Sequence, residues 1–552
     1  MQSTVEREAL WWQRGVIYQV YPRSFQDSNS DGIGDLAGVT GRLDYLRWLG
    51  VHAVWLSPFY PSPMADFGYD VSDYVDVDPI FGTLADFDAL LDAAHERGLK
   101  VIVDYVPNHT SDQHPWFVEA RASRKSPKRD WYVFRDPKPD GSPPNNWLAA
   151  FGGPAWTLDE ATGQFYLHSF LPQQPDVNWR NPELKEAMFD VLRFWLDRDV
   201  DGFRFDVAPS VMKDPELRDN PMRSPEQTGS THKPMGEIDD QIPLHNRMHP
   251  DIHGLYREIR SLLDDHSAEQ PRYLVGETHI FEPEEWASLY GAALDEMHQP
   301  GNFGLLKVDW TAAGIRAHVD SFEAATPDGA WPNYVLSNHD EHRVATRVGR
   351  DQARNAMLLL LTLRGTPTLY YGEELGMQNV PVPLDREQDP WGLRVPGLGL
   401  GRDPERTPMR WDDSRNAGFT DPGVQPWLPL GEDATTLNVA AEQDRPGSML
   451  SMTRRLLELR HTHRALASGD YVAVEGTGEA VFAYVRSYDD ERFLIAINTT
   501  GHPASFSLAE AGAGEIVVST SMTLDGPLDL AGADLPPNEG VLIRLETTIS
   551  SR

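Results

Sequence analysis

The sequence predicts an α/β fold: a (β/α)8 TIM barrel with a subdomain inserted after the third strand and a C-terminal antiparallel β-domain. Three observations lead to this prediction. Short apolar runs recur along the chain, amphipathic segments lie between them, and short β-rich stretches replace this pattern near residue 470. Apolar runs without alternation are typical of strands buried on both faces, as in a parallel sheet covered by crossover helices.

Seven apolar runs are clear and one is weak. The clear runs are GVIYQVYP from Gly15, VHAVWLSP from Val51, KVIVDYVP from Lys100, GFRFDV from Gly202, YLVGET from Tyr273, NYVLSNHD from Asn333 and TPTLYYGEE from Thr366. The weak run, at about 293–297, is the predicted sixth strand. Residues 41–49 and 84–97 have apolar positions three and four apart and are predicted helices, the second ending at Gly98. Eight strands with helices between them indicate a closed barrel.

The uneven spacing of these runs predicts three domains. Residues 1–107 and 180–465 are predicted to form the barrel, with a loop insertion at about 377–420 after the eighth strand. Residues 108–179 are rich in Pro, Gly, Trp and Asn, lack the barrel rhythm and form the inserted B domain. Residues 466–552 contain short β-rich stretches separated by turn residues and form a C-terminal β-sandwich domain.

The composition excludes several functional classes. The 49 basic and 84 acidic residues give a net charge of −35, which repels nucleic acid and anionic membranes. The chain has no cysteine, so disulfides, thiolate catalysis and cysteine-ligated metal sites are excluded. Residues 1–10 do not resemble a signal peptide, and no run approaches the ~18 apolar residues of a membrane helix. We expect a cytoplasmic enzyme, monomeric or homodimeric, with no nucleic-acid or membrane partner.

Polar and charged residues gather where the apolar runs end. They are Asp104 and His109 after the third run, Arg204 and Asp206 at the fourth, Glu277 at the fifth, and His339 and Asp340 at the seventh. The carboxyl ends of barrel strands meet at one face, where active sites lie. A carboxylate beside an apolar core is costly unless it is paired or used. Several such groups at separate strand ends therefore favour a catalytic site over unrelated structural roles.

Five of these segments resemble the signature segments of the α-amylase superfamily, glycoside hydrolase family 13. They are DYVPNH (104–109), QPDVNW (174–179), GFRFDV (202–207), VGETH (275–279) and SNHD (337–340), in the family's order and spacing. QPDVNW, IYQVYPRSF (17–25) and RTPMRW (406–411) are similar to segments of the α-glucosidase and oligo-1,6-glucosidase branch. The resemblance implies a retaining, exo-acting α-glucosidase. It would hydrolyse terminal non-reducing α-linked glucose from short oligosaccharides or α-glucosides through a covalent glucosyl-enzyme, with some transglucosylation.

The resemblance also implies the catalytic roles. Asp206 matches the nucleophile, Glu277 the general acid and base, and Asp340 the carboxylate that holds the sugar's 2- and 3-hydroxyls. An oxocarbenium-like transition state needs an anion beside the anomeric carbon and a proton donor at the glycosidic oxygen, and a retaining pair lies ~5 Å apart. Arg204, two residues before Asp206, faces the same side of the strand and is expected to lower the pKa of Asp206. Glu277 needs a raised pKa to act as an acid.

The substrate pocket is predicted from the same resemblance. His109 and His339 match donors to sugar hydroxyls, Asp66 would bind the outer hydroxyls of the terminal glucose, and Tyr69 would stack on its ring. Arg402 matches the arginine that closes the pocket, paired with Asp66, and Arg406 is the other candidate. Val207 resembles the valine of members that prefer α-1,6 bonds. One side chain shifts specificity by only ~1–3 kcal/mol, so α-1,4 and α-1,6 preference both stay open.

The segment DSNSDGIGD (27–35) predicts a structural cation site. Asp27, Asn29, Asp31 and Asp35 have oxygen-bearing side chains, spaced as in the first part of a calcium loop. The family resemblance implies Ca²⁺, or Mg²⁺, with the backbone carbonyl of Ile33 as a further ligand. The alternative is a solvated turn rich in Asp and Asn. No organic cofactor is expected, and the chemistry needs no metal.

Two alternative functions follow from the same motifs. A sugar isomerase or transglucosylase, of the trehalose synthase or sucrose isomerase type, would use the same three carboxylates. Sucrose isomerases carry an RLDRD-like loop after the acid/base strand, whereas the nearest match in this chain, LDREQDP (384–390), lies elsewhere. Non-catalytic amylase-like subunits of amino-acid transporters lack part of the catalytic set and have a membrane helix. This chain has all three carboxylates and no such segment.

Overall fold

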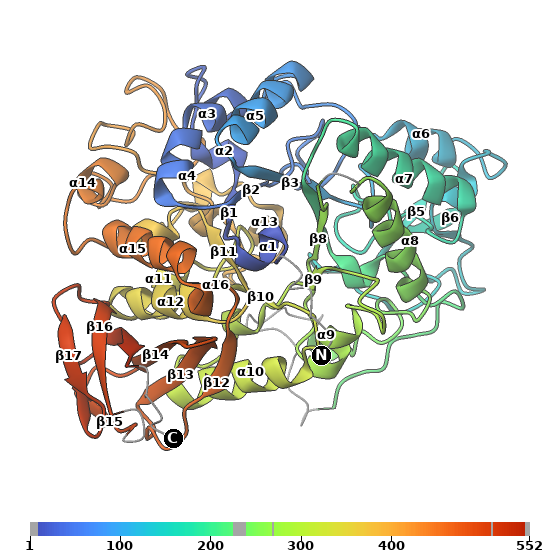
Figure 1. Ribbon diagram of the computed structural model, residues 1–552. Coiled ribbons are helices and arrows are strands. Elements are labelled where there is room, and N and C mark those ends of the chain that lie inside the picture. The colour runs from blue at the N-terminus through green and yellow to red at the C-terminus, as the bar shows by residue number, and fades with distance from the viewer. Residues whose placement is uncertain (1–8, 225–238, 268–269, 509–511, 547–552) are drawn as a thin grey trace.

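The computed structural model describes residues 9–224, 239–267, 270–508 and 512–546 (Figure 1). One sheet of eight strands forms the barrel, in the order β10-β11-β1-β2-β3-β7-β8-β9 with parallel neighbours. Its strands are β1 (Ile17–Val20), β2 (Ala53–Leu56), β3 (Lys100–Tyr105), β7 (Gly202–Phe205), β8 (Tyr273–Gly276), β9 (Gln299–Pro300), β10 (Asn333–Val335) and β11 (Thr366–Tyr370). Each of the seven clear apolar runs contains one of these strands, so the predicted fold class is confirmed.

The sixth strand does not lie where the sequence predicts it. It is β9 at Gln299–Pro300, not residues 293–297. Proline has no N–H to donate to a strand neighbour, which keeps β9 short and its pattern weak. Among the described residues no strand pairing joins β9 to β10. The side-chain amide of Gln299 instead donates to the carbonyl oxygens of Trp331 (3.1 Å) and Pro332 (3.0 Å) and completes the barrel wall.

Helices surround the barrel (Figure 1), and several of them begin at polar caps. Thr83 and Asp86 form a reciprocal capping box at the start of α5, and Asn181 caps α7. The helices are α1 (Trp11–Arg14), α2 (Pro22–Phe25), α3 (Leu36–Gly41), α4 (Leu43–Leu49), α5 (Leu84–Glu96), α6 (Pro115–Arg121), α7 (Pro182–Leu196), α8 (Ile252–Asp265), α9 (Pro283–Ser288), α10 (Ala312–Ala325), α11 (Val344–Arg347), α12 (Arg350–Thr362), α13 (Pro390–Arg394), α14 (Val439–Gln443), α15 (Met449–Thr462) and α16 (Arg464–Ser468). The predicted helices at 41–49 and 84–97 are α4 and α5. Within the described part of the chain, no helix is both long and apolar enough to cross a membrane.

A small antiparallel sheet follows β3 in the chain and lies at the right in Figure 1. Its order is β4-β6-β5, with β4 at Phe134–Arg135, β5 at Trp156–Asp159 and β6 at Gln164–Leu167. An isolated bridge between His109 and Asp176 joins the two ends of this inserted segment. The insertion is therefore anchored directly beside the barrel strand that carries Asp104.

A second antiparallel unit follows α16 (Figure 1). A six-stranded sheet, β12-β13-β14-β19-β16-β17, and a two-stranded sheet, β15-β18, enclose their own hydrophobic core. The side-chain amides of Gln352 and Asn355, on α12, donate to the carbonyl oxygen of Asn498 and tie this unit to the barrel. Its strands are β12 (Asp470–Ala473), β13 (Val481–Tyr488), β14 (Glu491–Asn498), β15 (Ala504–Phe506), β16 (Ala513–Ser519), β17 (Gly526–Asp529), β18 (Ala533–Leu535) and β19 (Gly540–Leu545).

Candidate active site

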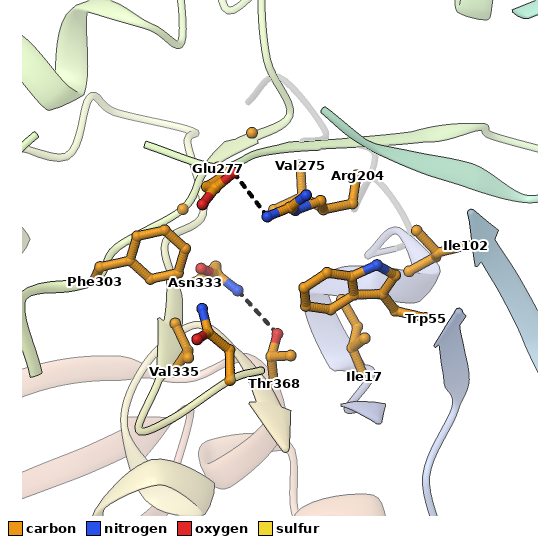
Figure 2. A pocket seen from close by; sticks show the side chains of 13 residues that line it. Ile17, Trp55, Ile102, Arg204, Val275, Glu277, Phe303, Asn333, Val335 and Thr368 are labelled. Carbon is orange, nitrogen blue, oxygen red and sulfur yellow. Dashed lines mark hydrogen bonds and ion pairs between the residues drawn. The ribbon is translucent and has the colours of Figure 1, made fainter. Parts of the chain in front are cut away.

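The carboxyl ends of the barrel strands bring the predicted catalytic residues together. Arg204 lies in β7, Asp206 follows that strand, Glu277 follows β8 and Asp340 follows β10. Figure 2 shows Arg204 and Glu277 above a cavity of about 30 Å³ inside the barrel, lined by Trp55 and Phe303 among others. That volume holds one or two water molecules and no sugar, so a sugar has to bind on the outer side of these groups.

Arg204 connects the two carboxylates that the sequence assigns to chemistry. Its Nη1 lies 2.7 Å from Asp104 Oδ1 and also contacts Asp206 Oδ1, while its Nη2 lies 2.8 Å from Glu277 Oε2. The Arg204 side chain is 4 % exposed. Because one buried guanidinium binds both, Asp206 and Glu277 face a common site. Asp104, which also accepts from the indole of Trp55 at 3.0 Å, is a partner of Arg204 that sequence reasoning left without a role.

Burial and neighbouring charges shift the pKa values of Asp206 and Glu277 in opposite directions. Burial raises the pKa of Asp206 well above its usual value, and although Arg204 opposes this, the charge of Glu277 adds to it. For Glu277 burial again favours the neutral acid, but the charge of Arg204 and a hydrogen bond from His279 outweigh it and lower the pKa of Glu277 to about 2. The expected directions, a lowered pKa for Asp206 and a raised one for Glu277, are therefore wrong for the free protein. Arg204 is shared with Asp104 and Glu277, so it cannot offset the desolvation of Asp206.

Val207 contributes its backbone to the same group. Its N–H donates to Glu277 Oε2 at 2.8 Å. Its φ of 37° lies in the left-handed region, which costs a β-branched residue about 1–3 kcal/mol. The chain thus places a strained residue directly after Asp206, and this strained conformation aims an N–H at Glu277. Sequence reasoning assigned Val207 only a side-chain role in linkage preference.

His339 and Asp340 form the opposite wall. His339 Nε2 lies 3.1 Å from Asp340 Oδ2 and 2.6 Å from the Tyr69 hydroxyl. The amide nitrogen of Gln19 donates to His339 Nδ1 at 2.8 Å, so the ring proton belongs on Nε2, facing the site. Burial lowers the pKa of His339 to about 3, which keeps the ring neutral. Burial alone would raise the pKa of Asp340, but His339 and the arginines Arg402, Arg406 and Arg204 hold it well below its usual range.

Two arginines from the insertion after β11 close one end of the site. Arg402 Nη2 lies 2.6 Å from Asp66 Oδ1 and 2.6 Å from Asp389 Oδ1, and its Nη1 lies 3.0 Å from Asp340 Oδ1. Arg406 Nη2 also lies 3.0 Å from Asp340 Oδ1. The expected Asp66–Arg402 pair is present, and both candidate arginines contact the same carboxylate. Asp389 has no local sequence signal, and sequence reasoning missed it.

His109 and Tyr69 belong to the same wall as Asp66. His109 Nε2 lies 3.2 Å from the carbonyl oxygen of Tyr69 and 3.1 Å from the amide nitrogen of Gln174. Gln174, from the inserted segment, also donates to Asp66 Oδ2 at 3.0 Å. Burial lowers the pKa of His109 to about 4, so this ring is neutral as well. The inserted segment therefore fixes the residues that were predicted to grip the terminal sugar.

The predicted cation loop is closed by internal hydrogen bonds. Asp27 Oδ2 accepts from the Gly32 N–H at 2.8 Å, Asp31 Oδ1 accepts from the Ile33 N–H at 2.8 Å, and Asp35 caps α3. Every side-chain donor atom is oxygen, including that of Asn29, which suits a hard cation. No group of three or more acidic or histidine side chains gathers as a ligand set in the described residues. The donor chemistry fits Ca²⁺ or Mg²⁺, and the site stays a prediction.

The chain matches known proteins along nearly all of its length. The family profile "Alpha amylase, catalytic domain" matches residues 19–469. A probable alpha-glucosidase of Rhizobium meliloti is 42% identical over 514 residues, covering 92% of each chain. An oligo-1,6-glucosidase of Parageobacillus thermoglucosidasius is 36% identical over 540 residues, covering 91% of this chain and 93% of its own.

Solved structures are similar as well. The alpha-glucosyl transfer enzyme XgtA superposes with a TM-score of 0.91 at 40% identity, covering 98% of this chain and 100% of its own. The trehalulose synthase MutB of Pseudomonas mesoacidophila superposes with a TM-score of 0.87 at 35% identity, with the same coverage. With Asp206, Glu277 and Asp340 gathered at the carboxyl end of its barrel, this chain belongs to the α-amylase superfamily, glycoside hydrolase family 13, in the branch of the α-glucosidases and oligo-1,6-glucosidases.

Proposed function

We propose that this glycoside hydrolase is a retaining, exo-acting α-glucosidase. It removes terminal non-reducing α-linked glucose from short oligosaccharides or α-glucosides and transfers some of that glucose to other alcohols. The observation that carries the proposal is the closed end of the site, where Asp66, Arg402 and Asp389 form buried ion pairs beside Asp340. A sugar chain cannot continue through this wall, so only a terminal glucose fits between it and the Asp206–Glu277 pair.

In the proposed reaction, Asp206 attacks the anomeric carbon while Glu277 protonates the departing oxygen. The glycosidic bond breaks, and a covalent glucosyl–Asp206 ester forms. Glu277, now ionised, takes a proton from water as the water attacks, which frees glucose and restores both carboxyl groups. A hydrogen bond joins Asp206 to Glu277, so the single proton of the pair passes to Glu277 for the first step and leaves Asp206 ionised as the nucleophile. His339, Asp340 and Asp66 are placed to hold the hydroxyls of the ring.

The test is product analysis with maltose, isomaltose, sucrose, trehalose and a maltoheptaose blocked at its non-reducing end. We expect free α-glucose as the first product from one or more of the disaccharides and no cleavage of the blocked chain. Release of internal fragments from the blocked chain would contradict exo action. Release of β-glucose as the first anomer would contradict retention.

A second candidate is a sugar isomerase that keeps both halves of sucrose in the site. The similarity to the trehalulose synthase, at 35% identity over 98% of this chain, favours it. Against it, the segment LDREQDP belongs to the insertion after β11, where Asp389 binds Arg402, and not to the loop after the acid/base strand. In the sucrose assay, a rearranged disaccharide in place of glucose and fructose would identify the isomerase.

Val207→Thr is expected to shift linkage preference toward α-1,4 bonds. The two side chains have the same shape, so the strained backbone and its N–H to Glu277 stay in place. The ratio of kcat/KM for maltose to that for isomaltose should rise about tenfold, within the range that one pocket side chain supplies. Val75→Thr, at a residue that is 38% exposed, is the matched control. An unchanged ratio would remove Val207 from linkage selection.

Removal of divalent cations is expected to lower stability and leave chemistry unchanged. We propose that Asp27, Asn29, Asp31, Asp35 and the carbonyl of Ile33 hold Ca²⁺ or Mg²⁺, which would brace the loop that follows β1. At cation concentrations near a hundred times Kd, chelation should cost about 2–3 kcal/mol in unfolding free energy. Thermal melts with and without chelator measure this, and Asp31→Ala should abolish the difference. A wild-type Tm that is the same with and without chelator would contradict the proposed cation site.

A further inference from the structure

His279 contacts Glu277 and has no part in the roles assigned so far. Its Nε2 lies 3.1 Å from Glu277 Oε1. It stands two residues after Glu277, on the loop that leaves β8. The ring is therefore placed against the group that is proposed to give and take the proton.

The two oxygens of Glu277 have different surroundings. Oε2 lies 2.8 Å from Arg204 Nη2 and accepts from the Val207 N–H at 2.8 Å. An oxygen that already faces two N–H donors is a poor place for a proton, since hydrogen on it would face hydrogen. The proton that Glu277 exchanges with the substrate accordingly belongs on Oε1, which is the oxygen that His279 contacts.

His279 is held in this position and reaches solvent. Its ring packs against Phe303 with centroids 4.9 Å apart and planes at 41°. Its side chain is 40% exposed, whereas that of Glu277 is 6% exposed. A fixed imidazole that is partly exposed to solvent can contact a buried oxygen and still leave room for a leaving group or an incoming alcohol on its exposed side.

We propose that His279 is a positioning residue for Glu277, donating its Nε2 proton to Oε1 and favouring the carboxylate form of Glu277. That form is the base of the second step, when water or another alcohol attacks the glucosyl-enzyme. His279 thus assists release of the glucosyl group in the second step. In exchange, it lowers the fraction of Glu277 that carries the proton needed in the first step. The inference rests on the proposed function of the site.

Other charged groups around Glu277 do not replace His279. Arg204 reaches Oε2, and Asp340 acts on Glu277 as a further negative charge. Asp206 shares Arg204 with Glu277. Arg247 Nη1 donates to the backbone oxygen of His279 at 3.5 Å. A hydrogen bond also links Asp206 to Glu277, but Asp206 is a carboxyl group that places no positive charge beside Oε1, whereas the His279 ring contacts Oε1 as an N–H donor.

The experiment compares pH profiles of kcat/KM on nitrophenyl α-glucoside for wild type, His279→Phe and His279→Gln. The alkaline limb of kcat/KM reports the loss of the single proton that Asp206 and Glu277 share. A donor to Glu277 favours the state in which both carboxylates are ionised, so loss of the donor keeps the shared proton bound to higher pH. In His279→Phe, which keeps an aromatic contact with Phe303, the alkaline limb should move up by about one pH unit. His279→Gln retains an N–H donor and should keep the wild-type limb.

A second readout separates the two steps. In His279→Phe, kcat should fall relative to kcat/KM on nitrophenyl α-glucoside, because the carboxylate needed for the second step is less available. An alkaline limb that stays in place or moves down in His279→Phe would overturn the proposal while the glucosidase activity stands. A wild-type chain that releases no glucose from any α-glucoside would instead refute the proposed function, and with it this role.

Discussion

Asp206→Asn is expected to lose about 10⁴-fold or more in kcat on nitrophenyl α-glucoside, because an amide cannot form the glucosyl ester. Arg204 keeps Asp104 and Glu277 as partners, and the neutral amide removes a repulsion between buried carboxylates. The variant should therefore fold normally. Its thermal melt, within a few degrees of wild type, is the control that separates lost chemistry from lost structure.

Glu277→Gln is expected to lose about 10²–10⁴-fold, the range for one positioned acid or base. The loss should be larger on maltose than on nitrophenyl α-glucoside, because nitrophenolate leaves without a proton. Equal losses on the two substrates would contradict an acid role for Glu277.

Azide distinguishes the two roles by stereochemistry. In Glu277→Ala, azide needs no base and attacks the glucosyl–Asp206 ester, so the product is α-glucosyl azide. In Asp206→Ala, azide takes the place of the missing carboxylate and displaces the leaving group directly, which gives β-glucosyl azide. NMR of the anomeric proton identifies each product. The opposite pattern would exchange the roles of Asp206 and Glu277.

Arg402→Met is expected to lower both stability and activity. The change leaves Asp66 and Asp389 as buried carboxylates that have lost their closest cation. Removing one partner of a buried ion pair costs about 3–5 kcal/mol. We expect the lower part of this range, because Arg406 still reaches Asp340 at 3.0 Å and Asp389 at 3.8 Å. Denaturant unfolding measures the free energy of unfolding, and kcat/KM on maltose measures the weakened binding of the terminal glucose.

The stability loss in Arg402→Met should depend on pH. Burial raises the pKa of Asp66 already in the wild type, where Arg402 opposes the shift. Without Arg402 the folded-state pKa rises further above its unfolded value, so the folded state binds protons more readily than the unfolded chain. Stability is then lost as pH rises through the folded pKa and regained as pH falls. The difference between variant and wild type should shrink from pH 7 to pH 5.

Two control variants make this result interpretable. Arg350→Met removes an arginine that is 51% exposed and paired with Asp433, and it should cost at most about 1 kcal/mol. Arg402→Lys keeps a charge but cannot reach three carboxylates in one plane, so we expect an intermediate loss. An Arg402→Met chain with wild-type unfolding and wild-type kcat/KM would show that this arginine does not close the pocket.

Local pattern was enough to locate most of the barrel. A strand buried on both faces needs an apolar run, and seven such runs contain β1, β2, β3, β7, β8, β10 and β11. The same logic failed for β9, where two residues including Pro300 carry almost no pattern. The motif residues converge because parallel strands end at one face, so the sequence alone groups Arg204, Asp206, Glu277 and Asp340.

Contacts between distant segments could not be predicted. Asp389 lies in an irregular segment, and Gln174 opens the QPDVNW segment, but nothing in the local sequence indicates that they hold Arg402 and Asp66. The sequence places Asp104 at a strand end, but it does not predict that Asp104 binds Arg204 together with Asp206 and Glu277. That sharing, together with burial, reversed the expected pKa directions of Asp206 and Glu277.

The sequence by itself determined the barrel, the family and the identity of the charged residues at the strand ends, because apolar periodicity and short motifs are local properties of the chain. Only the tertiary structure decided which carboxylate each arginine neutralises, how Val207 and His279 meet Glu277, and that one end of the site is closed. These depend on distances between segments far apart in the chain. Electrostatic interactions follow such distances and the burial of each group, neither of which is written in local sequence.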